Sequence, residues 1–145
     1  WPDRFVTPLD LAYEKDGERF ESDVLEIVER DELQTKLFPD LGSKSIELYK
    51  MEIAKAGSVF VNGPAGVYED SRWEKATKEI WKAIAACNAY TVIGGGDTIT
   101  AATKFTNLED YSYVCTAGGA MVRFLSGKKL PLILAMEKAW ERDKE

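Results

Sequence analysis

Apolar and polar positions divide the chain into short strands and longer helices separated by glycine-rich loops. Continuous apolar or β-branched runs predict buried strands at 58–61, 89–93 and 111–115. Each run enters a glycine-rich loop, after which apolar residues at helical spacing predict helices from 71, over 98–105 and through 124–125. A strand, a loop and a helix repeated in this order are typical of a parallel sheet covered by helices, so the predicted fold class is α/β.

The N-terminal region differs from this pattern. The segment 5–13 is strand-like, and Asp16-Gly17 predicts the turn of a β-hairpin. The expected architecture is therefore a Rossmann-like parallel sheet flanked by helices, with a β-hairpin near the N-terminus. Only about four sheet strands can be counted, whereas a doubly wound sheet usually has five or six. Because the chain also opens with Trp1, we expect an incomplete doubly wound domain whose remaining strands precede this residue.

Several helix ends carry recognisable signals. A helix over 45–56 is expected to end at Gly57 as its C-cap. The run Ser71-Arg72-Trp73-Glu74 has the form of a capping box at the start of a helix. Pro131 is predicted to begin a last helix that carries Trp140 on an apolar face, and such an exposed face predicts concentration-dependent association.

Charge and composition exclude several function classes. The 145 residues contain 19 Lys and Arg against 25 Asp and Glu, a net charge of −6, which argues against a nucleic-acid partner. No apolar run is long enough for a membrane span and no signal peptide is recognisable, so we expect a soluble, cytoplasmic protein without a membrane partner. Cys87 and Cys115 are expected to be free and reduced. Because the chain has no histidine, chemistry must rest on carboxylates, a metal or backbone amides.

All three loops that follow the predicted parallel strands are rich in glycine, at the sheet edge where ligands of α/β proteins bind. Glycine lets backbone N–H groups approach an anion, and the helix that follows directs its positive dipole end toward it. The run Gly94-Gly95-Gly96-Asp97-Thr98 adds a carboxylate, which suggests Mg²⁺ held together with nucleotide phosphates. It matches neither of the two commonest nucleotide-binding loops.

Each loop also has a structural interpretation. Asp97 could simply cap its helix. The run Asn62-Gly63-Pro64-Ala65-Gly66 could be a rigid turn, although Val67 offers an apolar surface to a base and Glu69 a carboxylate to a ribose. The segment 116–119 could serve close packing of a helix on the sheet. The coincidence of three such loops favours a binding function.

These loops closely resemble motifs of phosphoglycerate kinase, most of all the archaeal type. The segment 61–69 is similar to WNGPMGVFE of that family, 94–98 is its GGGDT, and 115–120 resembles STGGGA. Asp40 to Ser45 is similar to DIGPKT, Pro8-Leu9-Asp10 to PVD, and 125–131 to LEGKxLPG. The resemblance covers nearly the whole chain and identifies residues 1–145 with the C-terminal part of the nucleotide-binding domain. Val61 and Ala117 depart from the family pattern, where tryptophan and glycine stand.

The resemblance implies a kinase that binds Mg²⁺ with ADP or ATP on this domain and 3-phosphoglycerate or 1,3-bisphosphoglycerate on an N-terminal domain that this chain lacks. Carried over by position, Asp97 would hold the metal, the amides of Gly95, Gly96 and Thr98 would hold phosphates, and Gly118 and Gly119 would offer amides to the phosphoryl group in transfer. Asn62 would contact phosphate and Glu69 the ribose. Pro64 and Val67 would flank the nucleoside.

The three loops contain no Lys or Arg, although phosphoryl transfer needs positive charge around the reacting group. The nearest cations in sequence are Arg72, Lys104 and Arg123. We therefore expect half of a glycolytic kinase site that is silent in turnover by itself. A non-catalytic nucleotide-binding module that has kept the kinase fold is the alternative hypothesis. A dinucleotide-dependent oxidoreductase is a third, disfavoured by the absent GxGxxG motif.

Overall fold

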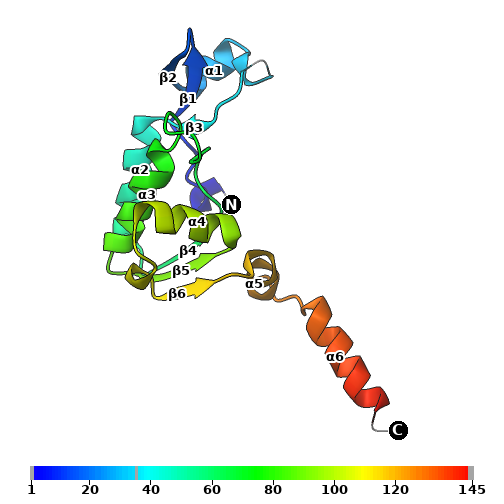
Figure 1. Cartoon of the computed structure of the whole chain (residues 1–145). Coiled ribbons are helices and arrows are strands. Elements are labelled where there is room, and N and C mark those ends of the chain that lie inside the picture. Colours follow the sequence, from blue (N-terminus) through cyan, green and yellow to red (C-terminus); the bar gives the residue numbers. More distant parts are fainter. Residues whose placement is uncertain (1, 35, 144–145) are drawn as a thin grey trace.

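The computed structural model describes residues 2–34 and 36–143, which form two three-stranded sheets, one antiparallel and one parallel (Figure 1). In chain order the elements are η1 (Pro2–Arg4), β1 (Asp10–Lys15), β2 (Glu18–Asp23), α1 (Val24–Glu29), η2 (Glu32–Gln34), β3 (Asp40–Leu41), α2 (Ser43–Lys55), β4 (Ser58–Asn62), α3 (Lys75–Ala86), β5 (Tyr90–Gly94), α4 (Gly96–Phe105), η3 (Leu108–Asp110), β6 (Tyr113–Cys115), α5 (Gly118–Leu125) and α6 (Pro131–Arg142). The α/β class and the parallel sheet predicted from the sequence are confirmed.

The parallel sheet has the strand order β4-β5-β6, with α3 and α4 as its crossover helices. Its core lies between one face of the sheet and the layer formed by α2, α3 and α4 (Figure 1). Trp81 on α3 is 1% exposed and packs there with Ile46, Ile93 and Ala102. The opposite face carries exposed aromatic residues, because Phe60, Tyr90 and Tyr113 alternate with the core-facing positions of their strands. Within residues 2–34 and 36–143, helices therefore cover one face of the sheet.

The antiparallel sheet has the order β2-β1-β3, and the predicted hairpin turn is confirmed at Asp16-Gly17, where both residues have positive φ. Two carboxylates of this sheet accept hydrogen bonds from the first N–H groups of α2. The Asp10 carboxylate accepts the N–H groups of Lys44 (3.0 Å) and Ser45 (2.8 Å), and the Glu21 carboxylate accepts the N–H of Ser43 (2.9 Å). Two strands far from α2 in sequence thus satisfy amides that a helix end leaves without partners.

Three local expectations from the sequence are wrong. The strand begins at Asp10 rather than at residue 5. Gly57 is not in a left-handed C-cap, because α2 ends at Lys55, its C-cap Ala56 has extended backbone and the chain then passes directly into β4. Ser71 does not cap α3, because residues 71–73 lie in a turn in which the Asp70 side chain accepts the N–H of Arg72. Helix α1 and strand β3 were not expected.

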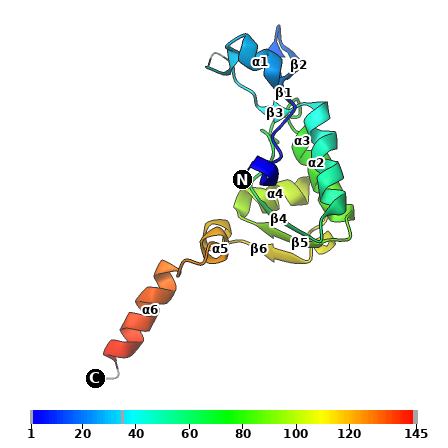
Figure 2. The same ribbon diagram turned by 180° about the vertical axis from the view of Figure 1, so that it is seen from behind.

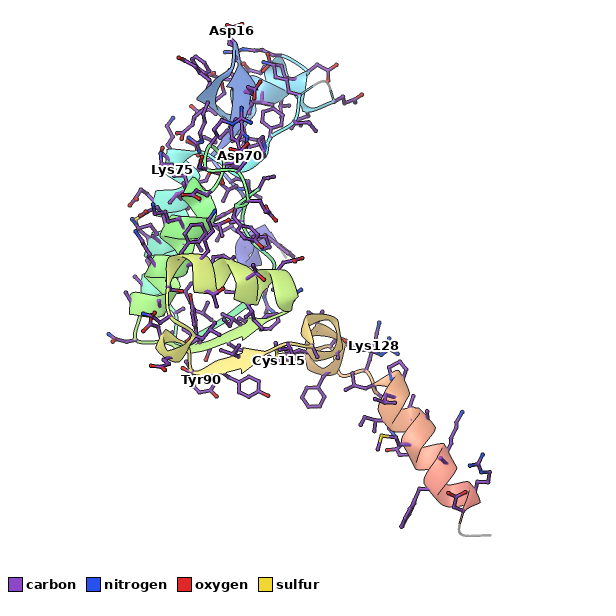
Figure 3. All side chains as sticks on the ribbon, in the orientation of Figure 1. Asp16, Asp70, Lys75, Tyr90, Cys115 and Lys128 are labelled. Atoms are coloured by element: carbon purple, nitrogen blue, oxygen red, sulfur yellow. The ribbon has the colours of Figure 1, made fainter. Side chains whose placement is uncertain are left out.

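Helix α6 extends away from the sheet in both views of the ribbon (Figures 1 and 2). It begins at Pro131 and carries Trp140, which is 66% exposed. Figure 3 places Lys128 in the connection between α5 and α6, and Cys115 at the end of β6 that faces α5. Cys87 and Cys115 are both free, as expected. Among the described helices, none has the length and apolarity that crossing a bilayer requires.

Candidate functional site

The register of the parallel sheet brings the three glycine-rich loops together. Asn62, the last residue of β4, pairs with Gly94, the last residue of β5, and Gly94 pairs in turn with Cys115, the last residue of β6. The three strands therefore end at one level. The N–H of Gly95 donates to the Cys115 carbonyl oxygen at 2.9 Å and ties the second loop to the third.

The three loops meet in a junction where lack of space favours glycine at position 118 and backbone conformation favours it at position 95. A Cβ on Gly118 would lie 2.4 Å from Asn62 Oδ1, 2.7 Å from the Gly95 Cα and 2.8 Å from the Gly95 nitrogen. Gly95 itself has φ of +96°, a backbone conformation that favours glycine. At this sheet edge the second and third loops therefore pack backbone against backbone, and the first loop packs against them through the Asn62 side chain.

The side chain of Thr98 fastens the first loop to α4. Its buried hydroxyl accepts the N–H of Gly63 at 2.6 Å, and Gly63 holds φ of +100°. The Thr98 carbonyl oxygen accepts the indole N–H of Trp81 at 3.3 Å. The threonine of GGGDT thus supports the shape of the loops with its side chain, while its amide lies in the first turn of α4.

Two helices direct their N-termini at this junction. Helix α4 begins at Gly96, after Gly95 as its N-cap, and α5 begins at Gly118. Neither N-cap residue makes a side-chain capping bond. Gly96, Asp97 and Gly119 are exposed, so the first-turn amides lie beside an accessible carboxylate. This arrangement presents partial positive charge and backbone donors suited to an anion.

The loop after β4 is held by hydrogen bonds on the side away from the junction. The N–H of Gly66 donates to Thr77 Oγ1 (3.1 Å), and the N–H of Val67 donates to the Pro39 carbonyl oxygen (2.8 Å). Pro64 is half-buried, whereas Val67 and Glu69 are exposed. A fixed backbone therefore presents an apolar and an acidic side chain to solvent beside α4.

The pKa of the Tyr68 phenol is raised by its surroundings. Burial raises the pKa of its phenol, and the negative charges of Glu69 and Asp97 raise it further. A hydrogen bond with the Thr100 side chain and the charge of Lys104 act in the opposite direction. Glu69 and Asp97, from different loops, thus both lie close enough to Tyr68 for their charges to act on it.

The cations nearest to the loops in sequence are engaged elsewhere. Arg72 pairs with Asp70 at 2.7 Å and with Glu14 at 2.8 Å. Lys104 pairs with Glu74 at 2.8 Å, and Arg123 donates to the Lys129 carbonyl oxygen at 2.9 Å. Arg72 and Arg123 are thus engaged outside the glycine loops, whereas Lys104 also donates to the Tyr68 carbonyl oxygen of the first loop at 2.6 Å. The three loops themselves carry no Lys or Arg, so the donors that they offer to an anion are backbone amides and the Asn62 side chain.

The ten residues predicted for the site occupy these three loops and the first turns of α4 and α5. They are Asn62, Pro64, Val67, Glu69, Gly95, Gly96, Asp97, Thr98, Gly118 and Gly119. Asn62, Gly95 and Gly118 are in direct proximity. Sequence reasoning missed the hydrogen bonds from Trp81 to the Thr98 carbonyl oxygen and from Lys104 to the Tyr68 carbonyl oxygen, for which the sequence carries no local signal.

The two departures from the family pattern do not obstruct the junction. Val61 packs toward the core rather than into the loops. Ala117 has φ of −97°, so a side chain at this position requires no left-handed backbone.

The side chains of these loops suit a metal ion only when phosphate oxygens supply further ligands. In residues 2–34 and 36–143, no group of three or more His, Cys, Asp or Glu side chains is placed to hold an ion. Asp97 is a single exposed carboxylate at a helix N-terminus. One carboxylate with phosphate oxygens and water is a common environment for Mg²⁺.

Comparison with known proteins gives a consistent result. Residues 2–128 match the family model of phosphoglycerate kinase. Phosphoglycerate kinase of Methanopyrus kandleri is 43% identical over 136 residues, 92% of this chain and 32% of that protein. The crystal structure of the enzyme from Pyrococcus horikoshii superimposes with a TM-score of 0.75 and 34% identity, covering 93% of this chain. The structure of phosphoglycerate kinase from Coxiella burnetii also gives 0.75, with 32% identity over 85% of this chain.

The matches cover nearly all of this sequence but only part of each relative. The chain spans about a third of the length of the curated relatives that it matches, in the relatives from Methanopyrus kandleri, Methanothermus fervidus and Methanococcus maripaludis alike. The loop motifs, the parallel sheet and the family match agree, and the chain belongs to the phosphoglycerate kinase family.

Proposed function

We propose that residues 1–145 form the C-terminal part of a nucleotide-binding domain and bind Mg-ADP or Mg-ATP at the junction of the three loops. The observation that carries this proposal is the common level at which β4, β5 and β6 end, with Asn62, Gly95 and Gly118 packed together. Two helix N-termini and an exposed carboxylate lie at this edge. The helix N-termini suit the phosphates of a magnesium nucleotide, and the carboxylate suits its Mg²⁺.

In this proposal each loop has its own role. The exposed amides of Gly96 and Gly119 bind phosphate oxygens, and Asn62 binds phosphate through its side chain. Asp97 holds Mg²⁺, whose charge offsets that of the phosphates. Pro64 and Val67 contact the nucleoside on one side, and Glu69 accepts hydrogen bonds from the ribose hydroxyls.

The proposed parent activity is phosphoryl transfer between 1,3-bisphosphoglycerate and ADP, in a kinase whose second substrate occupies another domain. The 145 residues by themselves are expected to be inactive. Arg72, Lys104 and Arg123 are each bound to other groups, so the loops have no side-chain cation for the transferring phosphoryl group. Side chains outside these 145 residues must supply that charge.

Calorimetric titration of this chain with Mg-ADP tests the proposal. Binding is expected, and it should weaken when magnesium is omitted and in the Asp97→Asn variant. Glu109→Gln is the matched control, because Glu109 is an exposed carboxylate outside the loops. The absence of binding by a folded sample, or equal binding by both variants, would contradict the proposal.

The alternative is a nucleotide-binding module of the same family without turnover, which the lack of loop cations favours. The two hypotheses separate when this chain is joined to the remaining two thirds of a relative's sequence. Acyl-phosphate turnover by the joined protein supports the kinase, and nucleotide binding without turnover supports the module.

A further inference from the structure

Lys104, in the last turn of α4, binds two groups of the segment that follows β4. Its ammonium donates to the Tyr68 carbonyl oxygen at 2.6 Å and lies 2.8 Å from Glu74 Oε2. The same nitrogen lies 5.9 Å from the centre of the Tyr68 ring and 5.1 Å from that of Phe105. A cation with a carbonyl, a carboxylate and two aromatic neighbours has one well-defined position.

The two polar partners of Lys104 bracket Glu69 in the sequence, because Tyr68 directly precedes it and Glu74 ends the same segment. Between them the backbone forms a compact turn. The N–H of Asp70 donates to the Val67 carbonyl oxygen (3.3 Å), and the N–H of Trp73 donates to the Asp70 carbonyl oxygen (2.9 Å). Lys104 thus holds both ends of the turn that carries Glu69.

The same helix carries Asp97 in its first turn. Asp97 and Lys104 are seven residues apart, which corresponds to roughly 10 Å along a helix. Helix α4 is therefore a rigid spacer, with the proposed metal ligand at one end and the anchor of the Glu69 turn at the other. The side-chain hydroxyl of Thr98 adds a second attachment, since it binds Gly63 at the start of the same loop.

We propose that Lys104 is a positioning residue, which fixes the nucleoside side of the loop relative to the phosphate side. The inference rests on the proposed function, because it assigns Glu69 to the nucleoside and Asp97 to the metal. Lys104 acts through the loop and does not contact phosphate, since its charge is already paired with Glu74.

The proposal separates affinity for the nucleoside from affinity for the phosphates. In Lys104→Met, Mg-ADP should bind about tenfold more weakly, which is the effect of one lost charge-assisted contact. Magnesium tripolyphosphate, which has no nucleoside, should bind equally to the variant and to the native chain. Lys104→Arg keeps the charge and should recover most of the affinity for Mg-ADP. Lys82→Met is the matched control, because Lys82 lies on α3 and pairs only weakly with Glu79, at 3.9 Å.

Amide hydrogen exchange gives a readout that needs no ligand. The amides of Asp70 and Trp73 should exchange faster in Lys104→Met and at the native rate in Lys82→Met. Native exchange at these amides, or an equal loss of affinity for both ligands, would overturn the positioning role. Failure of the native chain to bind Mg-ADP would instead refute the proposed function, and faster exchange in the same variant would still reveal the anchor.

Discussion

The side-chain oxygen of Asn62 occupies the space that a Cβ on Gly118 would need, with 2.4 Å between the two positions. The two residues are far apart in sequence: Asn62 is the last residue of β4, and Gly118 is the first residue of α5, after the loop that follows β6. Gly95 closes the same junction from the third loop, since its Cα lies 2.7 Å from that Cβ position. The first loop thus contacts this junction through the Asn62 side chain, and the second and third loops contact each other through backbone atoms.

Substitution of Gly118 should therefore disturb all three loops. The Gly118→Ala variant must displace the backbone of Gly95, and overpacking of this kind costs about 1–3 kcal/mol of unfolding free energy. Urea denaturation measures the loss. Gly119→Ala is the control, because nothing lies within 4 Å of a Cβ on Gly119 and alanine favours the helix. Equal stability of the two variants would contradict this prediction, because it would mean that the Gly95 backbone moves aside at little cost in free energy.

The buried hydroxyl of Thr98 provides a second prediction. Thr98→Val keeps the shape of the side chain but removes the acceptor of the Gly63 N–H. A buried donor without a partner costs roughly 1–3 kcal/mol. Thermal denaturation should show this loss in Thr98→Val and native behaviour in Thr98→Ser. Thr103 bonds only within α4 and is exposed, so an equal loss in Thr103→Val would argue against a specific role for Thr98.

Much of this architecture follows from local sequence patterns. The apolar runs at β4 and β5 and the periodicity of α3 require only neighbouring residues, and Asp16-Gly17 provides a turn that few other pairs form. The meeting of the three loops also follows, since the ends of parallel strands share one sheet edge. Asn62, Gly95 and Gly118 were expected there because each lies at the end of a strand or in the loop that follows it.

Contacts between distant segments could not be predicted from such patterns. Ser71 has the sequence of a helix cap, yet Asp70 captures the local amide, and the Asp40 carboxylate accepts the N–H of Ala76 in α3 at 3.3 Å. Asp10 caps α2 in the same way across 34 residues. Carboxylates supplied by other strands replace the local caps, and only the tertiary fold places them.

Glu21 should make stability depend on pH. Burial alone raises its pKa, but hydrogen bonds from Ser43 and Arg19 outweigh this and lower it from 4.5 to about 2. Because the unfolded chain takes up the proton first as pH falls, the contribution of Glu21 is present above about pH 4.5 and is lost toward pH 2.

Denaturation of Glu21→Gln across this range tests the linkage. The variant should be less stable than the native chain at pH 7 by about 1–2 kcal/mol, since a charged acceptor is lost. The difference should shrink as pH falls through the range from 4.5 to 2. Glu18 is exposed at the start of β2, so Glu18→Gln should follow the native curve. A difference that stays constant with pH would contradict the assignment.

The exposed apolar residues of α6 predict self-association of this chain. Leu132 and Met136 lie one turn apart and are 71% and 60% exposed, and Phe124 on α5 is 68% exposed. Soluble monomers rarely expose large apolar patches to solvent, because such patches favour association. Sedimentation velocity should therefore show an average mass that rises with protein concentration. Leu132→Glu places a charge within the apolar stripe and should shift the chain toward monomer. Lys138→Glu changes an already charged, exposed position of the same helix and should leave association unchanged. A monomer at every concentration, or equal effects of the two substitutions, would mean that this face does not drive association.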